Sequence, residues 1–125
     1  MLSDWMQSIS PWLVTLLESY PVLIYNGQND IILNAVQCEH FLQQLEWTSQ
    51  PGTSDWHTAP RQIWKVEESD YDVAGYVKQQ TPVNAPGLTY VVVREAGHLV
   101  PQDQPVRAYD MINRYIQQMP FSKQV

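Results

Sequence analysis

The sequence contains two runs of consecutive apolar residues, one over 21–25 and the other over 88–93, and elsewhere apolar and polar residues are mixed. Both are rich in β-branched residues, and neither alternates with polar positions. Such runs are typical of strands that are buried on both faces, as in a parallel sheet covered by helices. Gly27 ends the first run and Gly97 follows the second. We therefore expect buried strands over 21–26 and 88–93.

In three other segments the apolar residues recur with the spacing of a helix. Residues 3–19 predict a helix that Pro11 divides, because proline has no amide hydrogen to donate inside a helix. Residues 34–47 predict a second helix. Residues 103–118 predict a last helix capped by Asp103 or Gln104, with an inward apolar face of Val106, Tyr109, Ile112 and Ile116.

Residues 62–66 and 72–78 predict a two-stranded antiparallel ribbon around an acidic turn, after a polar loop over 48–60. The elements follow in the order helix, strand, helix, ribbon, strand, helix, which is typical of an α/β architecture with a parallel sheet. A chain of 125 residues has the length of one domain, so we expect a single unit over 1–125.

Composition narrows the function classes. Seven Lys and Arg against thirteen Asp and Glu give a net charge of −6, which disfavours binding to nucleic acid or to anionic membranes. The apolar runs are too short to span a membrane, and a single cysteine excludes an internal disulfide. Nothing in the sequence calls for a cofactor or a metal ion.

Asp30 and His98 each follow one of the two buried strands, 68 residues apart in the sequence. In open α/β sheets the chemistry lies beyond the carboxyl ends of the strands, so the two would be neighbours if their strands are neighbours. His98 would then act as a general base, and Asp30 would accept its Nδ1–H. Taken alone, Asp30 is equally well read as a turn residue or helix cap, and His98 as a surface histidine.

The other candidate side chains give weaker signals. Cys38 and His40 lie two residues apart on a predicted helix and face different directions, so they do not form a metal site. His57 has no evident partner in its polar loop, and Asp103 is most simply a helix cap. The tryptophans are interpreted as core or loop-packing residues.

Three segments resemble serine carboxypeptidases. The segment 22–30, Val-Leu-Ile-Tyr-Asn-Gly-Gln-Asn-Asp, resembles the part of that family that carries the triad aspartate. The segment 95–105, Glu-Ala-Gly-His-Leu-Val-Pro-Gln-Asp-Gln-Pro, resembles the family's Gly-His-x-Val-Pro-x-Asp-x-Pro histidine signature, and 73–78 is also similar. Residues 11–14 and 110–115 further resemble the vitellogenic-like branch.

The resemblance implies the C-terminal part of an α/β-hydrolase fold that removes C-terminal residues from peptides, with Asp30 as the triad acid and His98 as the base. It also implies that Leu99, at a position where the family usually has Met, lines the pocket for the leaving residue. A secreted or lysosomal/endosomal location is implied too, although no signal peptide is recognisable in this chain.

The family's nucleophile lies in a Gly-x-Ser-x-Gly elbow upstream, and none of the eight serines of this chain has that context. We therefore expect the N-terminal part of the same domain to be missing, and the 125 residues alone to be inactive and poorly soluble. Two alternatives stay open: a non-catalytic or interaction fragment, and an acyltransferase built on the same scaffold.

Overall fold

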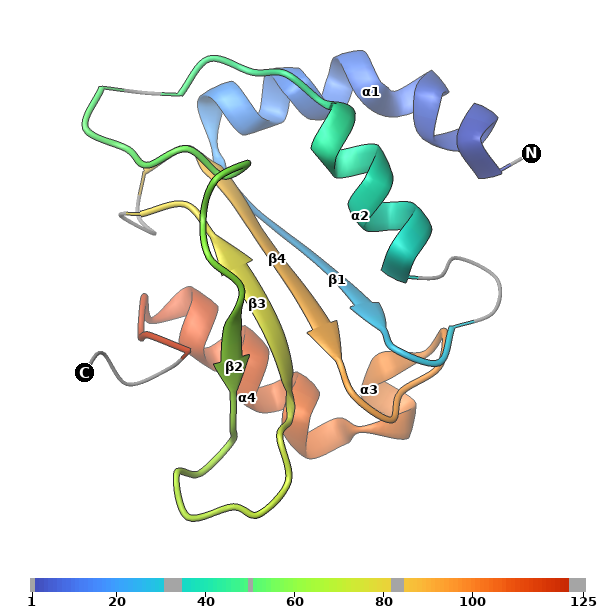
Figure 1. The fold of residues 1–125 in the computed structure, drawn as a ribbon, viewed down its shortest axis with the longest axis vertical. Coiled ribbons are helices and arrows are strands. Elements are labelled where there is room, and N and C mark those ends of the chain that lie inside the picture. The colour runs from blue at the N-terminus through green and yellow to red at the C-terminus, as the bar shows by residue number, and fades with distance from the viewer. Residues whose placement is uncertain (1, 31–34, 50, 82–84, 122–125) are drawn as a thin grey trace.

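The structure is a computed structural model that describes residues 2–30, 35–49, 51–81 and 85–121. The described chain forms four strands and four helices (Figure 1). In order they are α1 (Leu2–Ser19), β1 (Pro21–Gly27), α2 (Ala35–Gln44), β2 (Gln62–Trp64), β3 (Gly75–Gln79), β4 (Gly87–Val93), α3 (Val100–Asp103) and α4 (Pro105–Ile116).

The strands form one mixed sheet in the order β1-β4-β3-β2. β1 runs parallel to β4, with Gly27 opposite Val93, while β3 is antiparallel to both β4 and β2. The predicted ribbon is therefore confirmed, and the two apolar strands are direct neighbours. Because they are parallel and in register, their carboxyl ends reach the same edge of the sheet.

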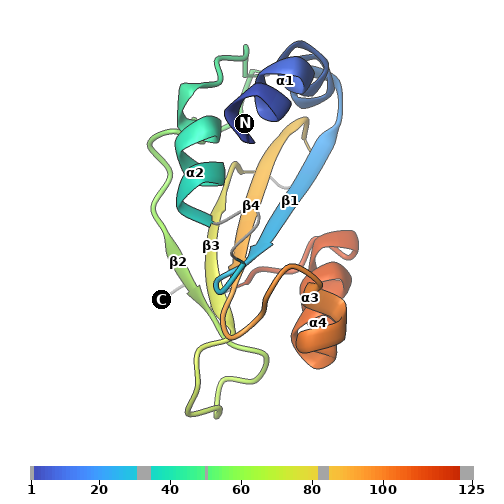
Figure 2. The same cartoon turned by 90° about the vertical axis from the view of Figure 1, so that its right-hand side faces the viewer.

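Helices cover the sheet on both faces (Figure 2). β4 distributes its side chains between two cores, because successive residues of a strand point to opposite faces. Leu88 and Tyr90 pack in the core that includes residues of α1 and α2, whereas Val91 and Val93 pack in the core that includes residues of α3 and α4. This three-layer arrangement is the expected α/β class.

The two apolar strands differ in burial. Six of the seven residues of β4 are buried, as predicted, but in β1 only Asn26 and Gly27 are. The prediction that β1 is buried on both faces was wrong for the described chain, because β1 is the edge strand of this sheet. Tyr25, near the end of β1, is exposed.

Pro11 does not divide the first helix as predicted. α1 is continuous over 18 residues with Pro11 inside it, and the Thr15 hydroxyl donates a hydrogen bond to the Pro11 carbonyl at 3.0 Å. The last predicted helix, over 103–118, corresponds to α4, and a short additional helix, α3, precedes it and ends at Asp103.

The predicted inward face of α4 was also wrong. Ala108 and Met111 are buried, while the apolar residues expected to face inward, namely Val106, Tyr109, Ile112 and Ile116, are exposed. The side of α4 that faces the sheet also makes polar contacts. The Asp110 carboxylate accepts hydrogen bonds from Trp64 Nε1 at 2.8 Å and from Arg114 Nε at 2.7 Å. Helical periodicity therefore located the apolar stripe of α4 correctly but not the face that packs.

Candidate active site

Asp30 and His98 meet where β1 and β4 end. Asp30 follows β1 through a tight turn in which its amide donates to the Gly27 carbonyl at 3.2 Å, and His98 lies five residues beyond β4. Nδ1 of His98 lies 3.0 Å from Oδ2 of Asp30, within hydrogen-bond distance. The proximity expected from the strand order is therefore present in the structure.

The two loops approach each other closely because residue 27 is a glycine. A Cβ on Gly27 would lie 2.1 Å from the Gly97 carbonyl oxygen and 2.4 Å from that of Ala96, which no side chain could occupy. Backbone hydrogen bonds hold the loops together, from the Gln28 amide to Val93 at 2.8 Å and from the Asn29 amide to Ala96 at 2.9 Å. The backbone thus positions the Asp30 and His98 side chains.

The side chains of Asp30 and His98 differ sharply in burial. The Asp30 side chain is 4% exposed and the His98 side chain is 54% exposed. A buried carboxylate can only accept hydrogen bonds, so Nδ1 of His98 carries the hydrogen in this contact. Nε2 has no hydrogen-bond partner within the described part of the chain, and it is left as a proton acceptor. This arrangement suits a histidine that takes up and returns a proton.

Asp103 does not cap α4 as the sequence suggested. It is the last residue of α3, and Gln104 takes the N-cap position of α4 without a side-chain capping bond. The Asp103 carboxylate instead accepts a hydrogen bond from the Gly97 amide at 2.7 Å. Helix-capping rules do not predict this contact with the His98 loop, because it joins Asp103 to a residue outside the helix.

Leu99 follows His98 directly and is 58% exposed. Its neighbour Val100 is buried in the core beside α4, which fixes the start of α3. Leu99 therefore presents an apolar surface beside the exposed histidine ring.

The His57 ring has four partners, so the interpretation that it had none was wrong. Its ring lies 3.2 Å from Asp55 Oδ1 through Nδ1 and 2.8 Å from the Leu45 carbonyl through Nε2. The ring also lies between Trp47 and Trp56, with centroid distances of 5.1 and 5.6 Å. An aspartate two residues before the histidine, in a turn-forming sequence, was the signal that could have revealed the pair.

Cys38 and His40 take no part in a common site. Cys38 is buried, and burial raises the pKa of its thiol to about 11. His40 lies 3.0 Å from the Gln44 amide on the surface of α2. Across the described residues, no three His, Cys, Asp or Glu side chains gather in a way that could hold a metal ion.

Comparisons with known proteins identify the family. A family model described as serine carboxypeptidase matches residues 1–118. The chain belongs to the serine carboxypeptidase family. It is 43% identical over 113 residues to a probable serine carboxypeptidase of Homo sapiens and 44% identical over 115 residues to a venom serine carboxypeptidase of Apis mellifera. These matches cover 90% and 92% of this chain.

The similarity to these serine carboxypeptidases covers 22% of each relative, so the chain spans about a fifth of their length. A solved prohormone-processing carboxypeptidase from Saccharomyces cerevisiae superposes with a TM-score of 0.68 at 26% identity, over 92% of this chain and 23% of that one. The chain thus has the fold of the C-terminal part of a serine carboxypeptidase, an α/β-hydrolase. Within its described residues, no helix combines the length and the apolar character needed to cross a bilayer.

Proposed function

We propose that this chain is the part of a serine carboxypeptidase that supplies the acid and the base of a Ser-His-Asp triad, Asp30 and His98, for removal of C-terminal residues from peptides. The observation that carries the proposal is the 3.0 Å contact between the buried Asp30 carboxylate and Nδ1 of an exposed histidine, at the carboxyl ends of neighbouring parallel strands. Membership of the serine carboxypeptidase family supports it.

In this mechanism Nε2 of His98 removes the proton from a serine hydroxyl as that oxygen attacks the last peptide bond. The same nitrogen then gives the proton to the amine of the departing residue, leaving an acyl-enzyme that water hydrolyses. Asp30 holds the ring in the tautomer with hydrogen on Nδ1 and stabilises the imidazolium. Leu99 forms part of the apolar wall against which the departing residue lies.

The 125 residues contain no Gly-x-Ser-x-Gly segment, so the serine belongs to the part of the domain that precedes them in the relatives. By themselves we expect them to hydrolyse no peptide, because His98 has no alcohol to activate. Peptides are thus substrates of the whole domain. A secreted or lysosomal/endosomal location belongs to the same proposal.

The test joins residues 1–125 to the remaining part of the Homo sapiens relative, a protein called here the completed chain. We expect it to release the last residue from an N-blocked dipeptide and to lose this activity with a fluorophosphonate that labels serine. The 125 residues alone serve as the control. A folded completed chain that leaves the dipeptide intact would contradict the proposal, and transfer to an added alcohol in preference to water would indicate an acyltransferase.

A further inference from the structure

The peptide unit between Ala96 and Gly97 is bound at both of its polar ends. Its carbonyl oxygen accepts a hydrogen bond from the Asn29 amide at 2.9 Å, directly before Asp30. Its N–H, which belongs to Gly97 directly before His98, donates to Oδ2 of Asp103 at 2.7 Å. One peptide plane therefore connects the Asp30 loop on one side with α3 on the other.

The Asp103 contact has the features of a strong hydrogen bond. A carboxylate acceptor and a distance of 2.7 Å mark it as charge-assisted. Such an acceptor polarises the amide, so the carbonyl at the other end of the same peptide becomes a better acceptor for Asn29. Removing the Asp103 carboxylate therefore weakens the link to Asn29 as well as the bond that it makes itself.

Gly97 makes room for this carboxylate. A Cβ on residue 97 would lie 3.0 Å from Oδ2 of Asp103, closer than side chains normally pack. Gly97 is not among the glycines with a left-handed backbone, so an alanine there is compatible with the local conformation. Substitution at 97 thus disturbs the same contact from its other side.

We infer that Asp103 is a positioning residue, whose carboxylate fixes the Ala96–Gly97 peptide and thereby holds His98 in hydrogen-bond geometry with Asp30. Asp103 itself touches no reacting atom. Its effect on catalysis depends on the proposed triad, but its effect on the Asp30–His98 contact does not.

The test compares Asp103→Ala with Asp103→Asn, which keeps an acceptor oxygen without the charge, in the completed chain. We expect Asp103→Ala to lower kcat about tenfold, the kinetic equivalent of one charge-assisted hydrogen bond, with KM unchanged. Asp103→Asn should retain activity to within about threefold, because its amide oxygen still accepts the Gly97 hydrogen. Gln102→Ala, an exposed neighbour on α3, is the local control.

A second pair of variants separates positioning from stability. Ala108→Gly destabilises α4 without removing a side-chain hydrogen bond to the loop, so it should lower the melting temperature and leave kcat unchanged. Gly97→Ala should lower kcat, and the double variant Gly97→Ala/Asp103→Ala should be no worse than Asp103→Ala alone, because the two act on one contact. Fully additive losses, or a loss of kcat in Ala108→Gly equal to that in Asp103→Ala, would overturn the inference.

Proton NMR gives a readout that is independent of peptidase activity. The hydrogen that Nδ1 of His98 shares with Asp30 resonates far downfield, and we expect its signal to weaken in Asp103→Ala and to recover in Asp103→Asn. A signal unchanged in Asp103→Ala would refute positioning even in an active enzyme. If the completed chain cleaves nothing but the signal still responds, the proposed function fails and the role of Asp103 stands.

Discussion

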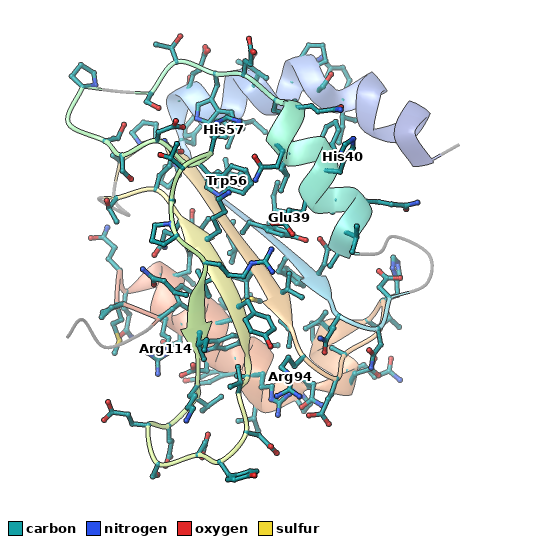
Figure 3. The ribbon with its side chains drawn as sticks, in the orientation of Figure 1. Glu39, His40, Trp56, His57, Arg94 and Arg114 are labelled. Carbon is teal, nitrogen blue, oxygen red and sulfur yellow. The ribbon has the colours of Figure 1, made fainter. Side chains whose placement is uncertain are left out.

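The described part of the chain contains two histidine–aspartate pairs of similar length but opposite surroundings. In the first, His98 Nδ1 lies 3.0 Å from a carboxylate that is 4% exposed, and the ring is 54% exposed. In the second, His57 Nδ1 lies 3.2 Å from a carboxylate that is 56% exposed, and the ring is 29% exposed. Figure 3 shows His57 near the end of the sheet where β4 begins and Arg94 near the end where β4 finishes.

The second ring nitrogen distinguishes the two pairs. Nε2 of His57 faces the Leu45 carbonyl at 2.8 Å, so both of its nitrogens face acceptors and the ring fastens the loop around 57 to the end of α2. Nε2 of His98 has no such partner in the described chain and is open to solvent. A contact with a carboxylate therefore does not by itself indicate catalysis, and the catalytic role proposed for His98 also depends on its unoccupied second nitrogen.

The largest expected difference between the pairs is in turnover. In the completed chain, His98→Ala should lower kcat by about 10⁶-fold, because removing a triad histidine removes the proton transfer itself. His57→Phe should leave kcat within about twofold. Steady-state hydrolysis of a blocked dipeptide measures both. Comparable losses in the two variants would show that neither histidine has a special chemical role.

The aspartates provide the second contrast. Asp30→Asn should preserve folding and lower kcat by about 10⁴-fold, because the amide offers an N–H to His98 and favours the wrong tautomer. Asp55→Asn should change kcat little, since the His57 ring that Asp55 contacts takes no part in the proposed proton transfer. Turnover is measured after thermal melting has shown that each variant is folded. Near-normal turnover in Asp30→Asn would remove it from the triad.

The first pair could be inferred from the sequence and the second could not, for a physical reason. Two unbroken apolar runs predicted two buried strands of one parallel sheet, and such strands bring the residues after them together if they are neighbours. The environment of the His57 ring depends on its contact with the Leu45 carbonyl. The position of that carbonyl follows from where α2 ends and how the polar loop folds back. The inward face predicted for α4 was wrong for a related reason. The side of α4 that packs carries Ala108, Met111 and the hydrogen bond from Trp64 to Asp110, a tertiary contact that helical periodicity does not reveal.

A third prediction concerns the structural role of His57. His57→Phe keeps a ring between Trp47 and Trp56 but removes both ring hydrogen bonds, so we expect the free energy of unfolding to fall by about 1–2 kcal/mol. His40→Phe, on the exposed surface of α2, is the matched control and should change it by less than about 0.5 kcal/mol. Urea unfolding of the completed chain measures both. Equal effects would mean that the His57 bonds add nothing to stability.

The smallest expected effect is the acid dependence of the exposed pair. The hydrogen bond from the His57 amide, supported by the His57 ring, holds the pKa of Asp55 below its usual value of 3.8. A carboxyl whose pKa is lower in the folded state stabilises the fold above the unfolded-state pKa, and this contribution is lost as the pH falls below about 4. Because Asp55 is exposed, the contribution lies within the roughly 0–1 kcal/mol of surface ion pairs.

Between pH 5 and pH 3, Asp55→Asn should therefore lose slightly less unfolding free energy than the unmodified completed chain, whereas Glu46→Gln should follow the unmodified chain. If Asp55→Asn leaves the pH dependence of the unfolding free energy unchanged, the Asp55–His57 pair adds no electrostatic stability and only orients the two side chains.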